Sequence, residues 1–449
     1  MASVRGSMFR RAAVALAMSA ASSIAMAQPA PVMAPPLFSS ANAPAITNFY
    51  NSRQGAPLWF RAGVSPTAAL KLVELLRRAS TEGVKADPQL AAAVEAAIAK
   101  AGTGNAAAVN EADRLVSNAW VAYVQALRAP TPGMIYGDPA VRYTPQRPEL
   151  VIGLAGRAPS LADHIEQVAA VNPLYRALRD AALTDPLLTS GPDAGKLAAN
   201  LDRVRSLPQT GRYIVVDAAA ARLWMFENGQ AVDSMKVVVG TPETPTPMVA
   251  SMIHYTTLNP YWHVPNNLLL KTVAPGVLKQ GKGYLKSRGY EVVSAWSNDA
   301  EIISPDTVDW KAVAAGKTEI KVRQLPGGTN SMGKMKFAFA NGEGIFLHDT
   351  PNKEKFDLSN RAVSNGCIRL EDAPRLARFM MGNDPKMAST EPDQHLRLPQ
   401  GMPVYVTYLT AQPTNGKVTF VNDVYGLDRS VASRVATVSQ SAAPAHAGN

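Results

Sequence analysis

The sequence is poor in the residues that build disulfides and metal centres. The chain of 449 residues contains one cysteine, Cys367, and six histidines. A single cysteine cannot form an internal disulfide, so its thiol is either incidental or reactive. There is no Cys-x-x-Cys or His-Glu-x-x-His motif, and the histidines show no ligand spacing. We therefore predict no structural or catalytic metal.

Long hydrophobic runs are missing beyond the N-terminus. Residues 1–27 combine three arginines, a short apolar core rich in alanine and serine, and a small-x-small sequence that ends at Ala27. This pattern predicts a secretory signal peptide cleaved after Ala27, which would place the mature protein in the periplasm. The alternative, an uncleaved anchor, is disfavoured because a membrane span needs about 20 apolar residues. We expect no membrane-spanning segment once the signal is removed.

The charge balance is basic. The full chain carries a net charge of +10, and loss of the three arginines in the signal would leave +7. A basic exported protein could favour an acidic polymer such as cell wall, or an anionic membrane. An excess of this size is more typical of an ordinary solvated surface. No nucleic-acid partner is expected.

The first part of the mature chain has a helical texture. A leader rich in proline and alanine, residues 28–44, precedes a region at 45–205 in which apolar residues follow helical spacing. Leu70, Val73 and Leu76, for example, recur at intervals of three, as on the buried face of an amphipathic helix. We interpret 45–205 as a helical domain.

The second part, residues 212–428, reads as short strands. Asn228-Gly229 lies between two of them and is a strong signal for a β-hairpin, which favours an antiparallel sheet. In residues 267–322, apolar and polar residues no longer alternate as they do in strands. We interpret this segment as an inserted, mobile cap, because long insertions are typically functional or disordered. The tail at 429–449 is rich in alanine and serine and is expected to be disordered.

The candidate catalytic residues lie between His348 and Arg369 in the sequence. A thiol is nucleophilic as the thiolate, and an imidazole is the usual group that removes its proton. His348 ends an apolar run that reads as a strand, and Cys367 follows the tight turn Ser364-Asn365-Gly366. A loop of this length can return to the strand it left, so the two side chains can meet. The structural alternative is a buried cysteine and an unrelated histidine.

The whole string resembles the active-site signature of the L,D-transpeptidases with a YkuD-type catalytic domain. That signature is a histidine, roughly fifteen residues, then Ser/Thr-x-Gly-Cys, a hydrophobic residue and Arg or Asn. Here 15 residues separate His348 from Ser364, and Asn365 stands where many members have a second histidine. The resemblance covers 212–428 closely and the helical region weakly.

The resemblance implies an α+β fold like that of the larger periplasmic members of this family. A helical scaffold domain would precede a mainly antiparallel β-sandwich catalytic domain that carries the inserted cap. The matching positions include several candidate substrate contacts: Arg369, Ser364, Asn365, Tyr261, Trp262, Asn330 and Lys336. Arg369 could bind a substrate carboxylate or hold the loop in place.

The family resemblance also implies the reaction. Peptidoglycan stem peptides would be the substrate, carbapenems would acylate Cys367, and no cofactor would be needed. Cys367 would form an acyl-enzyme with His348 as its base. The backbone N–H groups of Gly366 and Cys367 would bind the oxyanion.

Asp349 directly follows His348, and its carboxylate could orient the imidazole as the aspartate of a catalytic triad does. If the apolar run before it is a strand, successive side chains point to opposite faces, so its carboxylate faces away from His348. The resemblance instead places the orienting group at the backbone carbonyl of Asp349.

Two other functions are compatible with the same residues. A thiol peptidase or L,D-carboxypeptidase would pass the acyl group to water, with the same Cys367 and His348. A non-catalytic wall-binding scaffold would carry an inert thiol, which the intact signature argues against.

Overall fold

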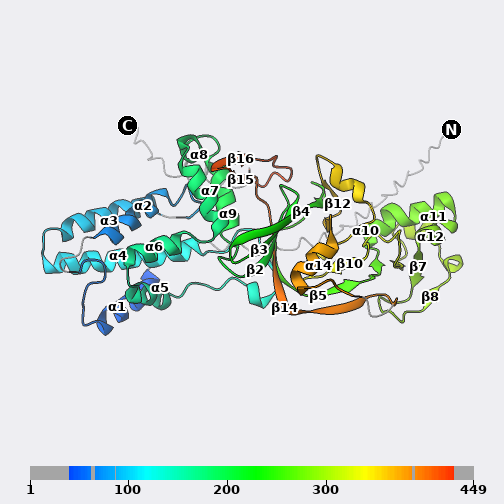
Figure 1. Ribbon diagram of the computed structural model, residues 1–449, viewed down its shortest axis with the longest axis horizontal. Helices are drawn as coiled ribbons and strands as arrows, with labels where there is room; N and C mark the ends of the chain where they lie inside the picture. The colour runs from blue at the N-terminus through cyan, green and yellow to red at the C-terminus, as the bar shows by residue number, and fades with distance from the viewer. Residues whose placement is uncertain (1–39, 62–65, 86, 387–389, 429–449) are drawn as a thin grey trace, which may run out of the picture. The chain divides into compact units, whose positions relative to one another are not determined.

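The computed structural model describes residues 40–61, 66–85, 87–386 and 390–428 (Figure 1). The expected signal peptide, most of the expected leader and the expected C-terminal tail lie outside these residues. Among the described residues, no helix is both long and apolar enough to cross a membrane.

The N-terminal region is helical, as its periodicity predicts. Its helices are α1 (Ala43–Ser52), α2 (Thr67–Arg78), α3 (Pro88–Ala101), α4 (Ala106–Leu127), α5 (Pro148–Arg157), α6 (Leu161–Ala169), α7 (Pro173–Leu183), α8 (Pro186–Ser190) and α9 (Ala194–Val204). Polar side chains cap several of them. Asn105, for example, accepts hydrogen bonds from two backbone N–H groups at the start of α4, which satisfies donors that the helix itself leaves free.

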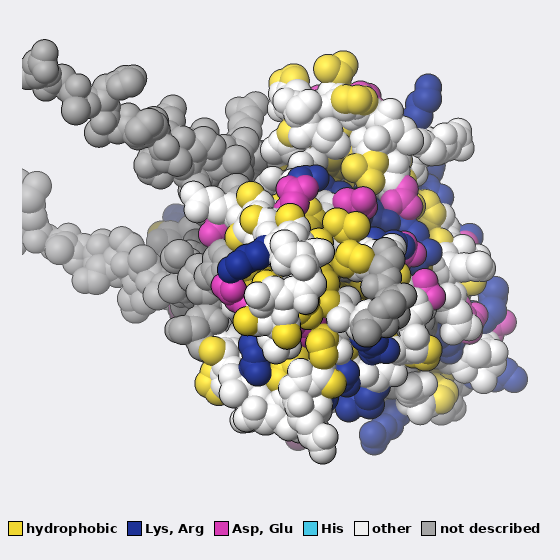
Figure 2. Space-filling view, turned by 90° about the vertical axis from the view of Figure 1, so that its left-hand side faces the viewer, with side chains coloured by type: hydrophobic (Ala, Val, Ile, Leu, Met, Phe, Trp, Pro, Cys, Tyr) yellow, Lys and Arg dark blue, Asp and Glu magenta, His cyan; other side chains and the backbone are white. Residues whose placement is uncertain are grey.

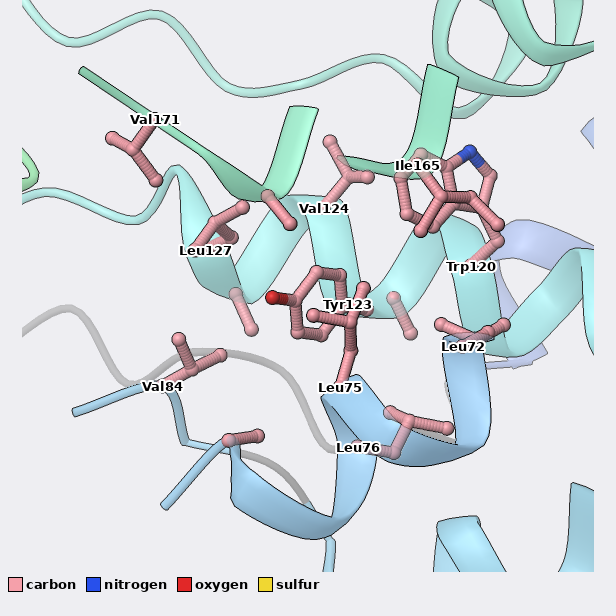
Figure 3. Packing of buried hydrophobic residues seen from close by; sticks show 14 of the residues in the cluster. Leu72, Leu75, Leu76, Val84, Trp120, Tyr123, Val124, Leu127, Ile165 and Val171 are labelled. Atoms are coloured by element: carbon pink, nitrogen blue, oxygen red, sulfur yellow. The ribbon is translucent and has the colours of Figure 1, made fainter. Parts of the chain in front are cut away.

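The helices pack through large apolar side chains. Leu72 and Leu75 of α2 lie against Trp120 and Tyr123 of α4 in one buried cluster (Figure 3). Leu70, which the spacing of three places on the buried face, is 45% exposed, whereas the other two residues of that expected face are buried. The prediction for Leu70 is wrong because the buried face of α2 is centred on Leu72 and Leu75.

Side chains of both charge signs are present on the face of the molecule shown in Figure 2. In the space-filling view of Figure 2, Lys and Arg side chains lie among acidic and hydrophobic ones. This distribution is typical of an ordinary solvated surface.

The C-terminal region is built on one large sheet. Its strands are β1 (Ile135–Tyr136), β2 (Arg212–Asp217), β3 (Arg222–Glu227), β4 (Gln230–Gly240), β5 (Val249–Leu258), β10 (Met335–Phe337), β11 (Leu347–His348), β12 (Ala362–Ser364), β13 (Ile368–Leu370) and β14 (Gln394–Thr407). Most pairs are antiparallel, as predicted. Because β14 pairs with β2 on one side and β5 on the other, the sheet closes on itself.

The predicted hairpin is present between β3 and β4. Asn228 and Gly229 have φ angles of 51° and 81°, the left-handed conformation that a two-residue hairpin turn requires. Asparagine and glycine adopt this conformation more readily than other residues.

A single strand of the sheet contributes to two cores. Ile214 and Val216 of β2 lie in the core that the closed sheet encloses. Tyr213 and Val215, which alternate with them, lie in the core formed by the helices. The helical region and the sheet are therefore packed against each other through β2.

Polar contacts and a strand also join the two regions. Arg203 of α9 donates to Asp428 at 2.7 Å and to the Tyr408 carbonyl at 3.0 Å, and all of these groups are buried. The short strand β1, which follows α4 in the chain, pairs in parallel with β5. The segment between α4 and α5 thus supplies an edge strand of the sheet.

The segment predicted to be a cap, residues 267–322, folds into a subdomain together with the residues that flank it. It comprises β6 (Trp262–His263), α10 (Asn266–Leu268), a π-helical turn (Leu269–Val273), α11 (Ala274–Gln280), α12 (Gly283–Arg288), β7 (Tyr290–Val293), β8 (Ile302–Ile303), α13 (Trp310–Ala314) and β9 (Lys321–Gln324). A separate sheet of order β6-β9-β7-β8 and a separate apolar core, which includes Trp310 and Val322, hold it together.

Two smaller elements complete the described chain. Helix α14 (Ala373–Met381) buries Leu376 and Ala377 against the core of the closed sheet. Strands β15 (Ala411–Thr414) and β16 (Lys417–Phe420) form a hairpin after β14.

Candidate active site

Three polar residues form a row across neighbouring strands. Lys336 of β10 pairs with His348 of β11, and His348 pairs with Arg369 of β13. Residues directly opposite each other in a sheet project from the same face. The next row projects from the other face, into the core: Phe337, Leu347 and Ile368. The polar row therefore lies on the face that is turned away from this core.

The thiol is on the same face as the row. Cys367 directly precedes β13, and the N–H of Ile368 donates to the carbonyl of Phe346 at 3.1 Å. Alternation along the extended backbone places Cys367 on the side of Arg369 and Phe346 on the side of His348. The structure thus brings the thiol and the imidazole to one face of two neighbouring strands, and Cys367 is partly exposed.

A hydrogen-bonded turn positions the cysteine. The hydroxyl of Ser364 donates to the carbonyl of Cys367 at 2.6 Å and accepts from the N–H of Gly366 at 3.2 Å. Gly366 has a φ of +106°, a conformation that residues with a Cβ rarely adopt. The small polar residue and the glycine of the signature are therefore both required by the turn.

Residues of a second loop form hydrogen bonds with this turn. Thr246 donates to the Gly366 carbonyl at 2.7 Å and accepts from the Gly240 N–H at 2.9 Å. The hydroxyl of Tyr425 donates to the Gly240 carbonyl at 2.7 Å. Reasoning from sequence missed the part played by Tyr425, because it comes from a segment 58 residues beyond the cysteine and carries no motif.

The imidazole is held by a backbone carbonyl. Nδ1 of His348 lies 2.5 Å from the carbonyl oxygen of Asp349. A carbonyl oxygen can only accept, so Nδ1 carries the proton and Nε2 of the neutral ring is free to accept one. The ring is therefore in the tautomer that a general base needs.

The carboxylate of Asp349 is engaged elsewhere. One oxygen accepts from Lys353 Nζ at 2.8 Å, and the other accepts from the Lys334 N–H at 2.9 Å. A Cβ added to Gly333 would lie 2.3 Å from this carboxylate, so the glycine allows the close approach. These contacts agree with the alternation of side chains along β11.

Burial and neighbouring cations determine the protonation of the site. Burial, Arg369 and Lys336 together lower the pKa of His348 to about 3, although the Asp349 carbonyl acts in the opposite direction. Burial raises the pKa of Cys367, while a backbone hydrogen bond with Phe346 and the same two cations lower it. The free site therefore holds a thiol and a neutral imidazole at neutral pH.

The other expected substrate contacts lie in different surroundings. Asn365 is exposed at the tip of the turn. Asn330 is fully buried, and its amide donates to the carbonyls of Pro260 and Leu325 and accepts from the Met332 N–H. That amide is used to hold a loop and is not presented to the exposed face.

The two aromatic candidates lie at the edge of the cap. Trp262 packs against the core of the cap. The Arg323 guanidinium lies 4.2 Å from the centre of the Tyr261 ring, and the Tyr261 N–H donates to Asp393 at 3.0 Å. These contacts hold Tyr261 against Arg323 and Asp393, and Trp262 against the core of the cap.

Comparison with known protein families defines the class. Residues 211–406 match the model of the L,D-transpeptidase catalytic domain, YkuD, and residues 44–181 match the model of the scaffold domain. The chain therefore carries an L,D-transpeptidase catalytic domain of the YkuD type, preceded by a scaffold domain.

The chain is also similar to individual proteins. The chain is 26% identical over 400 residues to a Haemophilus influenzae protein named "Putative L,D-transpeptidase", across 86% of this chain and 79% of the relative. Solved structures of L,D-transpeptidases from Mycobacterium smegmatis and Enterococcus faecium are each 14% identical, with TM-scores of 0.22 and 0.23. The matched regions cover 44% and 45% of this chain, and 59% and 52% of the two solved chains.

Proposed function

We propose that this protein is a peptidoglycan L,D-transpeptidase that crosslinks stem peptides through an acyl-enzyme on Cys367. The observation that carries the proposal is the shared face of Cys367 and His348, together with the hydrogen bond that fixes the imidazole. The domains proposed are a scaffold at 45–205 and a catalytic domain at 212–428 with a cap at 267–322. We also propose export through the signal at 1–27 and a periplasmic location, where the wall lies.

In the acylation step, Sγ of Cys367 attacks the carbonyl carbon at the L-centre of the donor peptide. Nε2 of His348 takes the thiol proton as the S–C bond forms, because the resting imidazole is neutral and its Nδ1 is occupied. The tetrahedral intermediate collapses by breaking the C–N bond. The imidazolium returns the proton to the leaving nitrogen, and the terminal D-amino acid departs as an amine.

The oxyanion would be bound by the turn before β13. Within the described part of the chain, the N–H of Cys367 makes no hydrogen bond and is available to an oxyanion. The N–H of Gly366 makes a long bond of 3.2 Å to Ser364, which a negatively charged oxygen can replace. Ser364 would then position the turn through its bond to the Cys367 carbonyl.

In the transfer step, the amine of a second stem peptide attacks the thioester. Nε2 of His348 takes a proton from the attacking nitrogen, the C–S bond breaks, and the proton returns to Cys367. The new peptide bond is the crosslink. If water attacks instead, the enzyme acts as a carboxypeptidase, the second candidate function. A cap over the acyl-enzyme would favour transfer, because it would exclude water from the thioester.

The experiment is mass spectrometry of muropeptides after incubation with the mature protein. We expect crosslinked dimers that have lost one terminal D-amino acid, and a carbapenem adduct at Cys367. Cys367→Ala should abolish both products, because no other thiol exists in the chain. Crosslinking by a folded Cys367→Ala variant would refute the proposal, and monomers shortened by one residue would identify the carboxypeptidase.

A further inference from the structure

One hydrogen bond sets the direction of the peptide bond between Gly366 and Cys367. The carbonyl of Gly366 accepts from the Thr246 hydroxyl at 2.7 Å. In a planar trans peptide the carbonyl and the N–H point in opposite directions. The N–H of Cys367 therefore points away from Thr246, and it is the donor that the proposed mechanism uses for the oxyanion. The bond from Thr246 thus fixes the direction of that donor.

The loop that carries Thr246, residues 240–246, bonds to the turn at two carbonyls. The N–H of Thr241 donates to the Ser364 carbonyl at 3.0 Å, and Thr246 donates to the Gly366 carbonyl. The Thr246 hydroxyl also accepts from the Gly240 N–H at 2.9 Å. Because a hydroxyl has one proton and can accept at the same time, these two bonds are compatible and orient the group. The position of the turn therefore depends on the position of this loop.

Tyr425 joins the two ends of the loop. Its hydroxyl donates to the Gly240 carbonyl at 2.7 Å and accepts from the Thr246 N–H at 3.3 Å. Both of these residues are buried, so the backbone groups would be left unsatisfied without the hydroxyl. Burial raises the pKa of Tyr425, although its hydrogen bonds with Thr246 act in the opposite direction. The hydroxyl therefore keeps the proton that it donates.

The segment that carries Tyr425 is itself anchored. The Tyr425 N–H donates to the Tyr408 hydroxyl at 2.9 Å, and the two rings are stacked with their centres 5.0 Å apart. The Tyr408 hydroxyl donates to Asp423 at 2.9 Å, and the same carboxylate accepts from the N–H groups of Leu427 and Asp428. The segment follows residue 406, where the match to the catalytic-domain model ends. Tyr425 is thus held in place by residues of its own part of the chain.

We propose that Tyr425 is a positioning residue for the oxyanion site, because it acts through Thr246 to hold the Gly366–Cys367 peptide with its N–H directed at the oxyanion. This inference rests on the proposed function. A donor that is fixed in advance stabilises the tetrahedral intermediate without reorganisation during the reaction. Tyr425 would not touch the substrate, so its loss should lower the rate at saturation and not the affinity.

The test compares two reactions of Cys367 in the full mature chain. Acylation by a carbapenem passes through a tetrahedral oxyanion, whereas alkylation by iodoacetamide displaces iodide and forms no oxyanion. We expect Tyr425→Phe to lower the rate at saturating carbapenem about tenfold, less than the loss of about 10²–10³-fold that follows removal of a donor. The half-saturating concentration and the alkylation rate should stay within about twofold of the wild-type values.

Variants of Thr246 test whether Tyr425 acts through this residue. Thr246→Val removes the hydroxyl at nearly constant volume and should slow acylation about tenfold or more, whereas Thr246→Ser keeps the hydroxyl and should retain most of the rate. Adding Tyr425→Phe to Thr246→Val should slow acylation no further, because the connection is already broken. Independent effects would multiply.

Tyr175→Phe is the matched control. It likewise removes one hydrogen-bonding tyrosine hydroxyl, which donates to Glu82 at 2.9 Å within the helical region. This variant should lower the melting temperature but leave both reactions of Cys367 at the wild-type rate. Equal slowing of acylation in Tyr175→Phe would show that the effect reports general stability, and the inference would be wrong.

Other results would also overturn the inference. An unchanged rate at saturation in folded Tyr425→Phe would do so, and an unchanged rate in folded Thr246→Val would do so whether or not Tyr425→Phe folds. Equal slowing of acylation and alkylation would mean that the thiol itself is displaced. Multiplication of the two losses in the double variant would mean that Tyr425 does not act through Thr246.

The proposed function is tested separately by the muropeptide products. A wild-type protein that a carbapenem acylates at Cys367 but that forms no crosslinked dimers would refute the crosslinking function. The inference about the oxyanion site would still be decided by the acylation rates, because acylation precedes any choice of acceptor.

Discussion

At the scale of residues, the orientation of one imidazole explains the proposed base. His348 is held through Nδ1 by the Asp349 carbonyl, while the Asp349 carboxylate is bound to Lys353 and to a backbone N–H. We therefore expect Asp349→Asn to keep carbapenem acylation within about tenfold of the wild-type rate, or ~1.4 kcal/mol. Asparagine retains an oxygen for the Lys334 N–H, so the loop should keep its conformation.

The matched comparison is His348→Ala. Loss of a general base typically slows a reaction by about 10²–10⁴-fold, so this variant should be far slower. Acylation rates measured for both variants by stopped-flow fluorescence or mass spectrometry separate the two roles. If Asp349→Asn reacts as slowly as His348→Ala and melts at the wild-type temperature, the carboxylate is the orienting group.

At the scale of elements, the cap can be removed where its first and last strands pair. The Val264 N–H donates to the Val322 carbonyl at 2.9 Å, so residues 266–320 can be replaced by a short Gly/Ser turn while β6 and β9 stay paired. We expect this deletion to raise hydrolysis relative to transfer, because a cover over the acyl-enzyme excludes water.

The readout is the ratio of shortened monomers to crosslinked dimers. The first acylation by a carbapenem should change little, which controls for damage to the catalytic domain. An unchanged product ratio in a deletion variant that still acylates would show that the cap does not shield the intermediate.

At the scale of the whole molecule, a buried ion pair joins the helical region to the end of the described chain. Asp428 accepts from Arg203 at 2.7 Å and from Thr410 at 2.6 Å, and its side chain is 6% exposed. Removing one partner of a buried pair leaves an uncompensated charge, so Asp428→Asn should lower the free energy of unfolding by about 3 kcal/mol.

An exposed pair provides the control. The side chains of Arg378 and Asp384 are 55% and 65% exposed, so Asp384→Asn should change stability by at most about 1 kcal/mol. Denaturant unfolding, followed by tryptophan fluorescence, measures both variants. Because the helices and β2 share one core, we also expect a single transition; two transitions, or equal effects of the two substitutions, would contradict this account.

Much of this architecture can be predicted from local sequence. Helical spacing before residue 205, the Asn228-Gly229 turn and the short strands after residue 212 predict a helical region followed by a mainly antiparallel sheet. These features are local, because backbone conformation and side-chain alternation are determined within a few residues. Leu70 shows the limit: its spacing predicts burial, but the partner helix determines which face of α2 is covered.

Sequence alone determined the composition of the candidate site: one thiol, a histidine separated by fifteen residues from a glycine-containing turn, and the Arg that follows. Tertiary structure decided which groups face one another. The pairing of β10, β11 and β13 aligns Lys336, His348 and Arg369, and β14 closes the sheet by pairing with β2 and β5. Strand register and sheet closure depend on hydrogen bonds between segments far apart in the chain, so no local pattern specifies them.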